Sequence, residues 1–530
     1  MIMQDIIKIK RALISVSDKS DLLPLAQWLA ESGCEIISTG GTAKFLQEHN
    51  IAITEISKIT GNPEAFSGRM KTISFQVESA ILFDRKKDKT EADALGIKPI
   101  DMVVCNLYPF EKYVNQNVDP DTLIENIDVG GPTMMRSAAK NFKFVTVVCN
   151  HKDYQSVIDE LKLNDGGISY ETRKRLMAFA FNITADYDSV IASAMDKLNG
   201  EESLRLSFKG GKELRYGENP HQKAMIFRER RADTSLYDVE VLNGIELSFN
   251  NLLDINAAIE AVSGLQSKGC AVIKHNNPCG LAQGKNPRQV LDLAWNGDRV
   301  SAFGGIVAFN CPINLSTVLF FNFDASEKKE RKFIEIIAAP EFSEETLQYL
   351  SKQKKLRVIR FNLDLTKNEM DLKFANGALL YQTKDNLFFD KLELVTKATF
   401  DIETKRELLS FGLHAVRQVK SNAIVTVRET KGCYQLIGIG AGQPNRLNSI
   451  SLALEKTAAN LQAEGKNNMD DVVLFSDAFF PFEDNVELLN RYGIKVIIQP
   501  GGSIRDKQVI EKCNQLGISM IFTGTRHFKH

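Results

Sequence analysis

The strongest constraint on the fold is the alternation of short apolar runs with amphipathic stretches in the first third of the chain. Residues 11–19 predict a strand followed by a polar turn, and residues 21–31 then place leucine and alanine at helical spacing. Residues 35–38 predict a second strand, and a further helix follows at 43–49. Strands that alternate with helices are typical of an α/β fold, so we expect a doubly wound parallel sheet.

The length of the chain predicts more than one domain. A domain takes roughly 100–200 residues, so the 530 residues suffice for two to four folded cores. Residues 171–191 predict a helix rich in alanine and phenylalanine, and the polar residues 199–203 interrupt its pattern. We therefore expect one domain over residues 1–199 and a second region over residues 200–530.

The charge balance argues against a nucleic-acid or membrane partner. Lys and Arg number 66 and Asp and Glu 67, so any anionic ligand must be held by local features. No apolar run is long enough to span a bilayer, and residues 1–5 lack the pattern of a secretory signal. The eight cysteines form no C-x-x-C pair and lie mostly in apolar runs, which is typical of core residues in a reducing compartment. We therefore expect a soluble cytoplasmic protein.

Lys274 and His275 follow a short apolar run, residues 269–273, that predicts a buried strand. Ligands of open α/β sheets bind just beyond the carboxyl ends of strands, so we expect both side chains at a ligand site. An imidazole exchanges a proton near neutral pH, and an adjacent ammonium group stabilises a developing oxyanion. The alternative is a lysine that extends into solvent beside a histidine that hydrogen-bonds a turn, and the pair alone does not exclude it.

A zinc site is the natural rival interpretation of this segment. Zinc nucleobase deaminases carry a Pro-Cys-x-x-Cys motif and a distant His-x-Glu. In this chain Pro278 and Cys279 are followed by Leu281 and Ala282, so the second cysteine of the motif is absent. No other group of His and Cys residues has the spacing of metal ligands, and we therefore expect no catalytic metal.

Polar residues of the first third gather where predicted strands end. Residues 39–42, Thr-Gly-Gly-Thr, join a strand to a helix start whose free amides attract an anion, although an ordinary β–α turn fits equally well. Residues 106–110 follow the strand 100–105, and residues 128–132 open a helix. The candidate charged or phenolic groups of these loops and helix ends are Arg69, Lys71, Tyr108, Asp128 and Lys140. Each alone fits solvated surface, but together they predict an anion site with acid–base groups.

Three stretches of the remaining chain combine turn residues with polar side chains. Residues 215–222 gather polar and aromatic groups around a glycine and a proline, which fits a ligand loop or a structural turn. Asn251 stands at the start of an alanine-rich helix, where it either binds a ligand or, more commonly, caps the helix. Residues 438–442 read Gly-x-Gly-x-Gly, with Arg446 just beyond, and permit close backbone approach to a ligand.

Three more places in the sequence complete the candidate site of the second region. Residues 301–309 form a turn followed by a strand, and Asn422 stands at the entrance of another strand. Residues 477–484 place three phenylalanines around a proline, which offers an apolar wall for a planar ring. Asp484 could accept hydrogen bonds from that ring, and core packing is the alternative role of at least one phenylalanine.

Taken together, the motifs resemble the bifunctional family that joins aminoimidazole-carboxamide ribonucleotide (AICAR) formyltransferase to inosinate (IMP) cyclohydrolase. The resemblance covers nearly the whole chain. In the first half it rests on residues 15–19, 38–42, 68–72, 106–110, 128–132 and 138–141. In the second half it rests on residues 215–221, 273–275, 301–305, 421–422, 438–443 and 476–484.

The resemblance implies a fold and an assembly. It implies an N-terminal methylglyoxal-synthase-like doubly wound parallel sheet and a C-terminal, duplicated cytidine-deaminase-like α/β domain without zinc. It also implies a homodimer with the transferase site between subunits, AICAR as substrate and 10-formyltetrahydrofolate as cosubstrate. Some relatives require potassium, so the resemblance is compatible with a structural potassium ion.

The resemblance also assigns roles in formyl transfer. His275 would act as base on the ring amine of AICAR as that amine attacks the formyl group. Lys274 would stabilise the tetrahedral oxyanion or help to protonate the leaving folate nitrogen, and Asn422 would hold the formyl or carboxamide oxygen. The residues that would contact the nucleotide or the pterin are Arg215, Tyr216, Asn251, Ser301, Phe303, Arg446, Phe479, Asp484, Arg526 and His530.

In the first domain the resemblance implies ring closure, in which the carboxamide nitrogen attacks the formyl carbon and water leaves. Lys71, Tyr108, Asp128 and Lys140 would move protons and stabilise charge. The residues that would bind the phosphate and the rest of the substrate are Ser17, Lys19, Gly41, Thr42, Arg69, Thr72 and Asn106.

The chain departs from the family pattern directly after Lys71 and Thr72. The family usually continues Leu-His-Pro and then His-x-Gly, whereas residues 73–79 read Ile-Ser-Phe-Gln-Val-Glu-Ser. We expect cyclohydrolase activity to persist because the charged groups assigned to ring closure remain. One alternative is a formyltransferase with an impaired first domain. Another is a nucleotide-binding regulatory protein, against which the intact Lys274–His275 pair argues.

Overall fold

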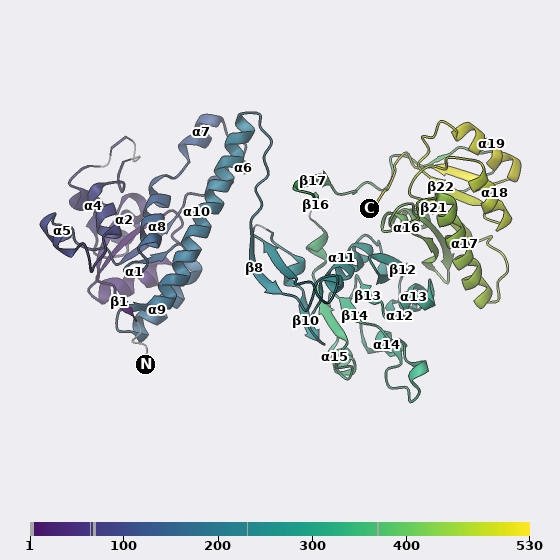
Figure 1. Ribbon diagram of the computed structural model, residues 1–530, viewed down its shortest axis with the longest axis horizontal. Coiled ribbons are helices and arrows are strands. Elements are labelled where there is room, and N and C mark those ends of the chain that lie inside the picture. Colours follow the sequence, from purple (N-terminus) through teal and green to yellow (C-terminus); the bar gives the residue numbers. More distant parts are fainter. Residues whose placement is uncertain (1–4, 64, 67–69, 231, 368–369) are drawn as a thin grey trace. The chain divides into compact units, whose positions relative to one another are not determined.

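The computed structural model describes residues 5–63, 65–66, 70–230, 232–367 and 370–530. The chain divides into two compact units, one up to Ser207 and the other from Phe208 to His530 (Figure 1). The boundary expected after residue 199 falls just beyond the long helix α10 (Tyr170–Leu198), and residues 200–207 belong to the first unit. Each unit encloses hydrophobic core of its own.

The first unit is built on a five-stranded sheet in the order β4-β3-β2-β5-β6. Its strands are β2 (Arg11–Val16), β3 (Glu35–Ser38), β4 (Thr54–Glu55), β5 (Met102–Asn106) and β6 (Thr146–Val148). All neighbours are parallel, which confirms the predicted parallel sheet. Because β2 pairs with both β3 and β5, the strand order reverses between β2 and β5. Doubly wound sheets bind ligands at such a switch point, beyond the carboxyl ends of the two strands.

Helices pack their apolar stripes against this sheet. α1 (Leu22–Glu31) buries Leu22, Leu25, Ala26 and Leu29, which is the face predicted by the helical spacing of residues 21–31. The other helices are α2 (Gly40–Glu48), α3 (Ile56–Thr60), α4 (Phe75–Leu82), α5 (Lys89–Ala94), α6 (Phe110–Asn115), α7 (Pro120–Glu125), α8 (Gly130–Lys140) and α9 (Tyr154–Leu163). Two short strands, β1 (Ile6–Lys8) and β7 (Gly167–Ser169), pair antiparallel beside the main sheet.

The second unit contains a twelve-stranded mixed sheet made by two copies of one arrangement. Each copy runs helix, antiparallel hairpin, helix and then three parallel strands. The first copy consists of α11 (Phe249–Ser263), β11 (Lys268–Lys274), β12 (Asn277–Gly284), α12 (Pro287–Trp295), β13 (Ile306–Phe309), β14 (Ile336–Ala339) and β15 (Arg357–Arg360). The second consists of α16 (Arg406–Arg417), β19 (Ile424–Thr430), β20 (Cys433–Gly440), α17 (Arg446–Ala463), β21 (Val472–Ser476), β22 (Val496–Gln499) and β23 (Ser519–Phe522). This is the duplicated α/β arrangement that the resemblance implies.

The hairpins of the two copies have the same turn and join the copies. His275 and Asn276 have φ of 54° and 60°, and Lys431 and Gly432 have φ of 51° and 70°. Two successive left-handed residues are the signature of a type I′ turn, which matches the twist of the flanking strands. β12 then pairs antiparallel with β20, so the two copies form one continuous sheet.

The remaining elements extend this sheet and its covering layers. They are β10 (Glu240–Asn243), β18 (Glu393–Leu394), α13 (Arg299–Ala302), α14 (Leu315–Val318), α15 (Glu344–Ser351), α18 (Asp484–Arg491), α19 (Asp506–Leu516) and the ribbons β8 (Phe208–Glu213) with β9 (Met225–Glu229) and β16 (Met370–Ala375) with β17 (Ala378–Thr383). None of the helices described is long and apolar enough to cross a bilayer. All eight cysteines are buried and unpaired, as predicted for core residues.

The strand registers bring many strand ends to one edge of the large sheet. β11 ends at Lys274, and its antiparallel neighbour β13 begins beside it, because Ile273 pairs with Ile306. β14 and β15 run parallel to β13 and therefore begin there too. The antiparallel contact between β12 and β20 places the start of β19 and the ends of β20 to β23 at the same edge. We call it the Lys274 edge.

A buried histidine makes the second unit sensitive to acid. His414 is 1% exposed, its Nε2 lies 2.7 Å from the carbonyl oxygen of Ala261, and a side chain on Gly264 would overlap its ring. Burial lowers the pKa of His414 to about 4. The unfolded chain, with an ordinary histidine pKa near 6.5, therefore binds a proton that the folded unit excludes. Stability is complete above about pH 6.5 and falls as the pH drops toward 4, by about 3 kcal/mol in all.

We expect His414→Gln to remove this contribution, since glutamine does not titrate. The free energy of unfolding of the second unit, from urea denaturation at several pH values, should fall less steeply between pH 6.5 and 4.5 in the variant. Equal slopes in the two proteins would show that His414 is not the group that takes up the proton.

Candidate active sites

The switch point of the first unit carries three of the predicted substrate contacts. The side-chain oxygen of Asn106, at the end of β5, accepts hydrogen bonds from the amides of Ser17 at 2.6 Å and of Asp18 at 3.0 Å. Its amide nitrogen donates to the carbonyl oxygen of Asp18 at 2.7 Å, so Asn106 fixes the loop that follows β2. The ammonium group of Lys19 donates to the carbonyl oxygen of Ser17 at 3.3 Å. A cation is thus held at the ligand-binding end of the sheet.

The start of α2 lies against the same loop. Thr42 is 4% exposed; its hydroxyl donates to the carbonyl oxygen of Val16 at 2.9 Å and accepts from the Val16 amide at 3.0 Å. A side chain on Gly41 would come within 4.0 Å of the Lys19 ammonium nitrogen. Free amides of a helix start attract an anion, and Lys19 adds a full positive charge beside them. These two features suit a phosphate group.

Three predicted acid–base residues lie around the start of α8. Asp128 accepts a hydrogen bond from the amide of Gly131 at 2.8 Å. Burial raises the pKa of the Asp128 carboxyl group, while the amides of Gly131 and Tyr108 and the charge of Lys71 act in the opposite direction. The Tyr108 side chain is 42% exposed and remains accessible to a ligand. A carboxyl group with a raised pKa beside a cation can move protons.

The other three predicted residues of this site have different positions. Thr72 is buried, and its hydroxyl oxygen lies 2.8 Å from where a side chain on Gly130 would begin, so Thr72 adjoins the start of α8. Lys140 is the last residue of α8. At 1.5 Å per residue it lies about 14 Å along the axis from the Asp128 contact, so the single chain does not bring it to the other three. Arg69 lies outside the described residues.

The departure from the family pattern forms the start of α4. Ser74 caps this helix by accepting a hydrogen bond from the amide of Val77 at 3.2 Å. Glu78 accepts a hydrogen bond from the hydroxyl of Ser137 on α8, and its second carboxylate oxygen is buried with no hydrogen-bond partner among the described residues. Burial raises the pKa of Glu78. The altered segment thus adds a carboxyl group between α4 and α8, which the motif comparison did not single out.

In the second unit, Lys274 and His275 lie where β11 meets its hairpin turn. Lys274 is half-buried and His275 is exposed, and the Lys274 ammonium group donates to the carbonyl oxygen of Phe303 at 2.9 Å. Lys274 is the last residue of β11, so the pair lies at the carboxyl end of a strand, as expected. Both neighbours of β11 are antiparallel to it, and the chain continues from His275 through a hairpin turn into β12.

A carboxylate behind the turn fixes its conformation. Asp254 on α11 accepts a hydrogen bond from the amide of Asn276 at 2.6 Å, and the amide of His275 also acts on it. Burial raises the pKa of Asp254. The left-handed backbone of His275 costs about 1–2 kcal/mol, and strain of this kind gathers at functional sites. Sequence inspection missed Asp254, because its partner lies 22 residues away.

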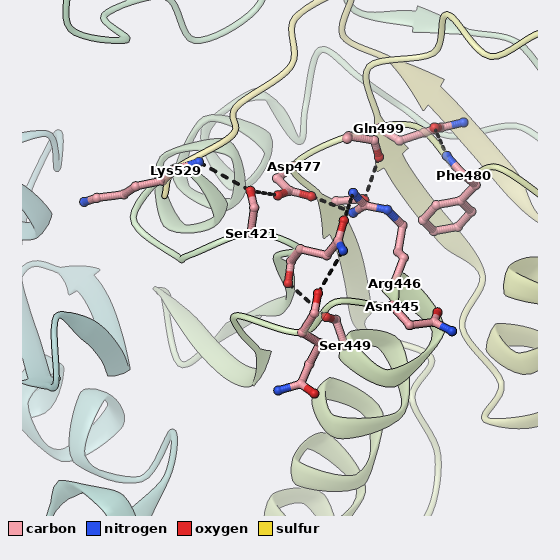
Figure 2. A network of polar contacts seen from close by, with 12 residues as sticks. Ser421, Asn445, Arg446, Ser449, Asp477, Phe480, Gln499 and Lys529 are labelled. Carbon is pink, nitrogen blue, oxygen red and sulfur yellow. Dashed lines mark hydrogen bonds and ion pairs between the residues drawn. The ribbon is translucent and has the colours of Figure 1, made fainter. Parts of the chain in front are cut away.

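Arg446 and Asp477 belong to a buried polar network at the same edge (Figure 2), and Arg446 also contacts Asn422. Arg446 is 7% exposed and donates to Ser476 at 2.7 Å, to Asp477 at 2.5 Å and to the side-chain oxygen of Asn422 at 2.7 Å. The Asn422 amide nitrogen donates to the carbonyl oxygen of Gln443 at 2.8 Å. Arg446 therefore holds Asn422 in place. The contact of Arg446 with the nucleotide stays a prediction.

A single asparagine joins the hairpin turn to the strand entrance that carries Asn422. The side chain of Asn277 donates to the carbonyl oxygen of His275 at 3.0 Å and accepts from the amide of Lys420 at 3.2 Å. Lys420 lies two residues before Asn422. The structure thus brings the Lys274–His275 pair and Asn422 to neighbouring positions, from segments about 150 residues apart.

A cavity of about 800 Å³ opens in the first copy near this edge. Its lining includes Arg215, Tyr216, Glu246, Phe333, Glu335, Lys355 and Arg357. The ring of Phe333 lies 5.4 Å from that of Phe303, whose carbonyl group binds Lys274, so packed side chains lead from the turn to the cavity. Three cationic and two anionic groups with aromatic walls suit a charged, ring-containing ligand.

The remaining predicted residues are placed as follows. Asn251 forms a capping box with Ser248, so the helix-cap role is the one observed. Ser301 hydrogen-bonds Asp298 at the start of α13 through its amide at 3.0 Å and its hydroxyl at 2.8 Å. Phe479 and Asp484 follow β21 in the chain, and Arg526 and His530 follow β23; both strands end at the Lys274 edge. The described residues contain no cluster of three or more His, Cys, Asp or Glu that could hold a metal ion.

Comparison with known proteins identifies the relatives of this chain. A family model described as "AICARFT/IMPCHase bienzyme" matches residues 138–456, and one described as "MGS-like domain" matches residues 21–133. A bifunctional purine biosynthesis protein PurH of Clostridium botulinum is 43% identical over 98% of this chain and 100% of its own length. The chain belongs to the AICARFT/IMPCHase bienzyme family. The PurH protein of Aquifex aeolicus is also 43% identical, over the same shares of the two chains. A crystal structure titled ForH, 32% identical, covers 36% of this family member and 99% of its own chain with a TM-score of 0.33.

Proposed function

We propose that this protein catalyses two consecutive steps of purine biosynthesis. It transfers the formyl group of 10-formyltetrahydrofolate to AICAR and then closes the ring of formyl-AICAR, with loss of water, to give IMP. The observation that carries the proposal is the Lys274–His275 turn, held at the Lys274 edge beside Asn422 in a member of the bienzyme family. Incubation of the purified protein with both substrates, followed by identification of the products, tests it.

In formyl transfer, His275 takes the proton of the ring amine of AICAR as the amine nitrogen bonds to the formyl carbon. Lys274 stabilises the negative charge that develops on the formyl oxygen, and its proton can pass to the folate nitrogen when the carbon–nitrogen bond breaks. Asn422 holds an oxygen of the reacting groups. Its orientation is supported by Arg446, which Asp477 in turn fixes.

In ring closure, the carboxamide nitrogen bonds to the formyl carbon, and that nitrogen loses a proton. The formamide nitrogen loses a second proton, and the formyl oxygen leaves as water after it has gained two protons in all. Asp128 is suited to exchange these protons, since its raised pKa lies closer to neutrality than that of an ordinary carboxyl group. Lys71 stabilises negative charge, Tyr108 donates a hydrogen bond, and Lys140 belongs to the same predicted set. The phosphate would be bound by Lys19, the start of α2 and Thr72.

The substrate contacts proposed for the transferase include Arg215 and Tyr216, which line the 800 Å³ cavity. Phe303, Phe479 and Asp484 would contact the pterin or the nucleotide, and Arg526 and His530 would close the site. We further propose a cytoplasmic homodimer, with residues 1–199 carrying cyclohydrolase and residues 200–530 carrying formyltransferase activity. A structural potassium ion is compatible with this family.

We expect Asp128→Asn to lower the rate of cyclisation of supplied formyl-AICAR by about 10²–10⁴-fold, because asparagine cannot exchange the proton. Formyl transfer to AICAR should stay within about twofold of the unaltered protein, since that site lies in the other unit. Cyclisation followed by the absorbance of IMP gives the first rate. An unchanged cyclisation rate in the variant would remove Asp128 from the mechanism.

A second candidate function is formyl transfer with an impaired cyclohydrolase domain. The observation that favours it is the replacement of the family's histidines by Ser74 and Glu78, which cap α4 and bond to α8. Supplied formyl-AICAR separates the two functions, because it bypasses the first step. IMP formation from formyl-AICAR supports the bifunctional enzyme, and formylation without IMP supports the alternative.

A further inference from the structure

One buried histidine fastens the end of the chain to the second unit. The side chain of His527 is 2% exposed. Its Nδ1 lies 2.6 Å from a carboxylate oxygen of Asp385, and its Nε2 lies 2.9 Å from the carbonyl oxygen of Phe388. A carboxylate and a carbonyl group can only accept, so both ring nitrogens must donate. Both bonds therefore require the imidazolium form, and a neutral ring would leave one acceptor facing a lone pair.

The backbone around His527 pairs with the network that holds Asn422. The His527 amide donates to the carbonyl oxygen of Asp477 at 2.9 Å. The amide of Ser421 donates to the carbonyl oxygen of Lys529 at 2.9 Å, and the Lys529 amide donates to the Ser421 hydroxyl at 3.3 Å (Figure 2). Residues 526–530 thus lie against Ser421, which precedes β19, and against Asp477, which follows β21. Asp477 contacts this segment and also binds Arg446, which holds Asn422, so the two positions are linked.

Charged groups from several elements surround the two partners of His527 and the segment that carries it. Asp385 is the one ion-pair partner of His527 among the described residues. Arg417 on α16 donates to the carbonyl oxygen of Asp385 at 3.1 Å and lies 4.5 Å over the ring of Phe388. Glu260 on α11 pairs with Lys384 at 3.4 Å and with Lys529 at 3.5 Å. The Asp385 carboxylate is thus the counter-charge in direct contact with the ring.

We propose that His527 is a positioning residue whose imidazolium, paired with Asp385, sets the docked position of residues 526–530 beside Asn422. The effect of His527 on catalysis rests on the proposed function, because that function assigns Arg526 and His530 to the substrates. The segment between β17 and β18 that carries Asp385 and Phe388 becomes part of the support of the transferase site. His527 acts only through the segment that it anchors.

The test uses the full-length protein with two substitutions that restore complementary hydrogen bonding. In His527→Gln the amide group donates to one acceptor, and its oxygen faces the other. In the double variant H527Q/D385N the new asparagine can donate to that oxygen, so both bonds return without any charge. Two quantities are measured: release of His530 by carboxypeptidase Y, and kcat and KM for AICAR in formyl transfer.

In H527Q we expect His530 to be released faster and kcat/KM for formyl transfer to fall, each by about tenfold to a hundredfold, with the larger part of the kinetic change in KM. In H527Q/D385N both quantities should return to within about threefold of the unaltered protein. Cyclisation of formyl-AICAR should be unchanged in both variants. A double variant as impaired as H527Q, or an H527Q protein that behaves as the unaltered one, overturns the proposal.

The two readouts separate this inference from the proposed function. If no form of the protein transfers formyl groups, but the release of His530 follows the expected pattern, the docking role stands and the proposed function fails. If H527Q does not fold, a comparison of two Asp385 variants tests the proposal. Asp385→Asn can donate to a neutral ring and should keep the segment docked, whereas Asp385→Ala should loosen it. Equal release from these two proteins overturns the proposal.

Discussion

Replacement of His275 by alanine is expected to lower kcat for formyl transfer by about 10²–10⁴-fold, while cyclisation of supplied formyl-AICAR continues at the unaltered rate. The ring amine of AICAR is a weak nucleophile and must lose a proton as it attacks, and alanine cannot accept that proton. The exposed turn presents His275 to solvent and ligands, whereas its backbone is held by Asp254. The loss should therefore appear in catalysis rather than in stability.

The two activities in the same sample provide the control for this variant. Rates of formylation and of cyclisation are measured by absorbance with AICAR plus 10-formyltetrahydrofolate and with formyl-AICAR alone. A His275→Ala protein that formylates AICAR at more than about a tenth of the original rate would contradict the assignment of the base. Loss of both activities would contradict separate sites.

Replacement of Asp477 by alanine is expected to lower the free energy of unfolding of the second unit by about 3–5 kcal/mol. Asp477 is fully buried and carries the charge that compensates Arg446, which is 7% exposed. Its carboxylate also accepts the hydroxyl of Ser421. Without Asp477 the guanidinium group is left buried without a counter-charge, and desolvation of an unpaired charge is costly. The orientation of Asn422, which Arg446 maintains, should be lost as well.

Urea denaturation followed by circular dichroism measures this change in stability. Asp484→Ala is the matched control, because Asp484 is an exposed aspartate seven residues further along. Its substitution should change the free energy of unfolding by about 0.5 kcal/mol or less. A loss below about 1 kcal/mol in Asp477→Ala would mean that the Arg446–Asp477 pair contributes as little as a surface ion pair.

The parallel sheet of the first unit could be predicted because its strands are buried on both faces. Residues 12–14, 36–37 and 102–105 are continuous apolar runs, and each strand is followed by a polar loop at its carboxyl end. The switch point between β2 and β5 then brings together Ser17 and Lys19 from the loop after β2 and Asn106 from the end of β5. Local pattern and topology agree there, so a candidate site could be proposed from sequence alone.

The site of the second unit depends on contacts that local pattern does not contain. Lys274 and His275 were expected just beyond the carboxyl end of a strand, and the chain turns back there through Asn276 and Asn277 into an antiparallel partner. The turn residues signal a bend and do not specify which strand follows. Arg446 illustrates the same limit, because its partner Asp477 lies 31 residues away and is fixed only by tertiary packing.

The altered segment after Thr72 shows a third kind of limit. The sequence shows that the family's histidines are missing, but it does not predict that Glu78 contacts Ser137 on another helix. That contact joins α4 to α8, the helix whose start carries Asp128.

The most direct test of the two-step account follows the products formed by the purified full-length protein from AICAR and 10-formyltetrahydrofolate. The account predicts that tetrahydrofolate and IMP appear in equal amounts, with formyl-AICAR as a transient intermediate. Accumulation of formyl-AICAR without IMP, or consumption of neither substrate, would contradict it.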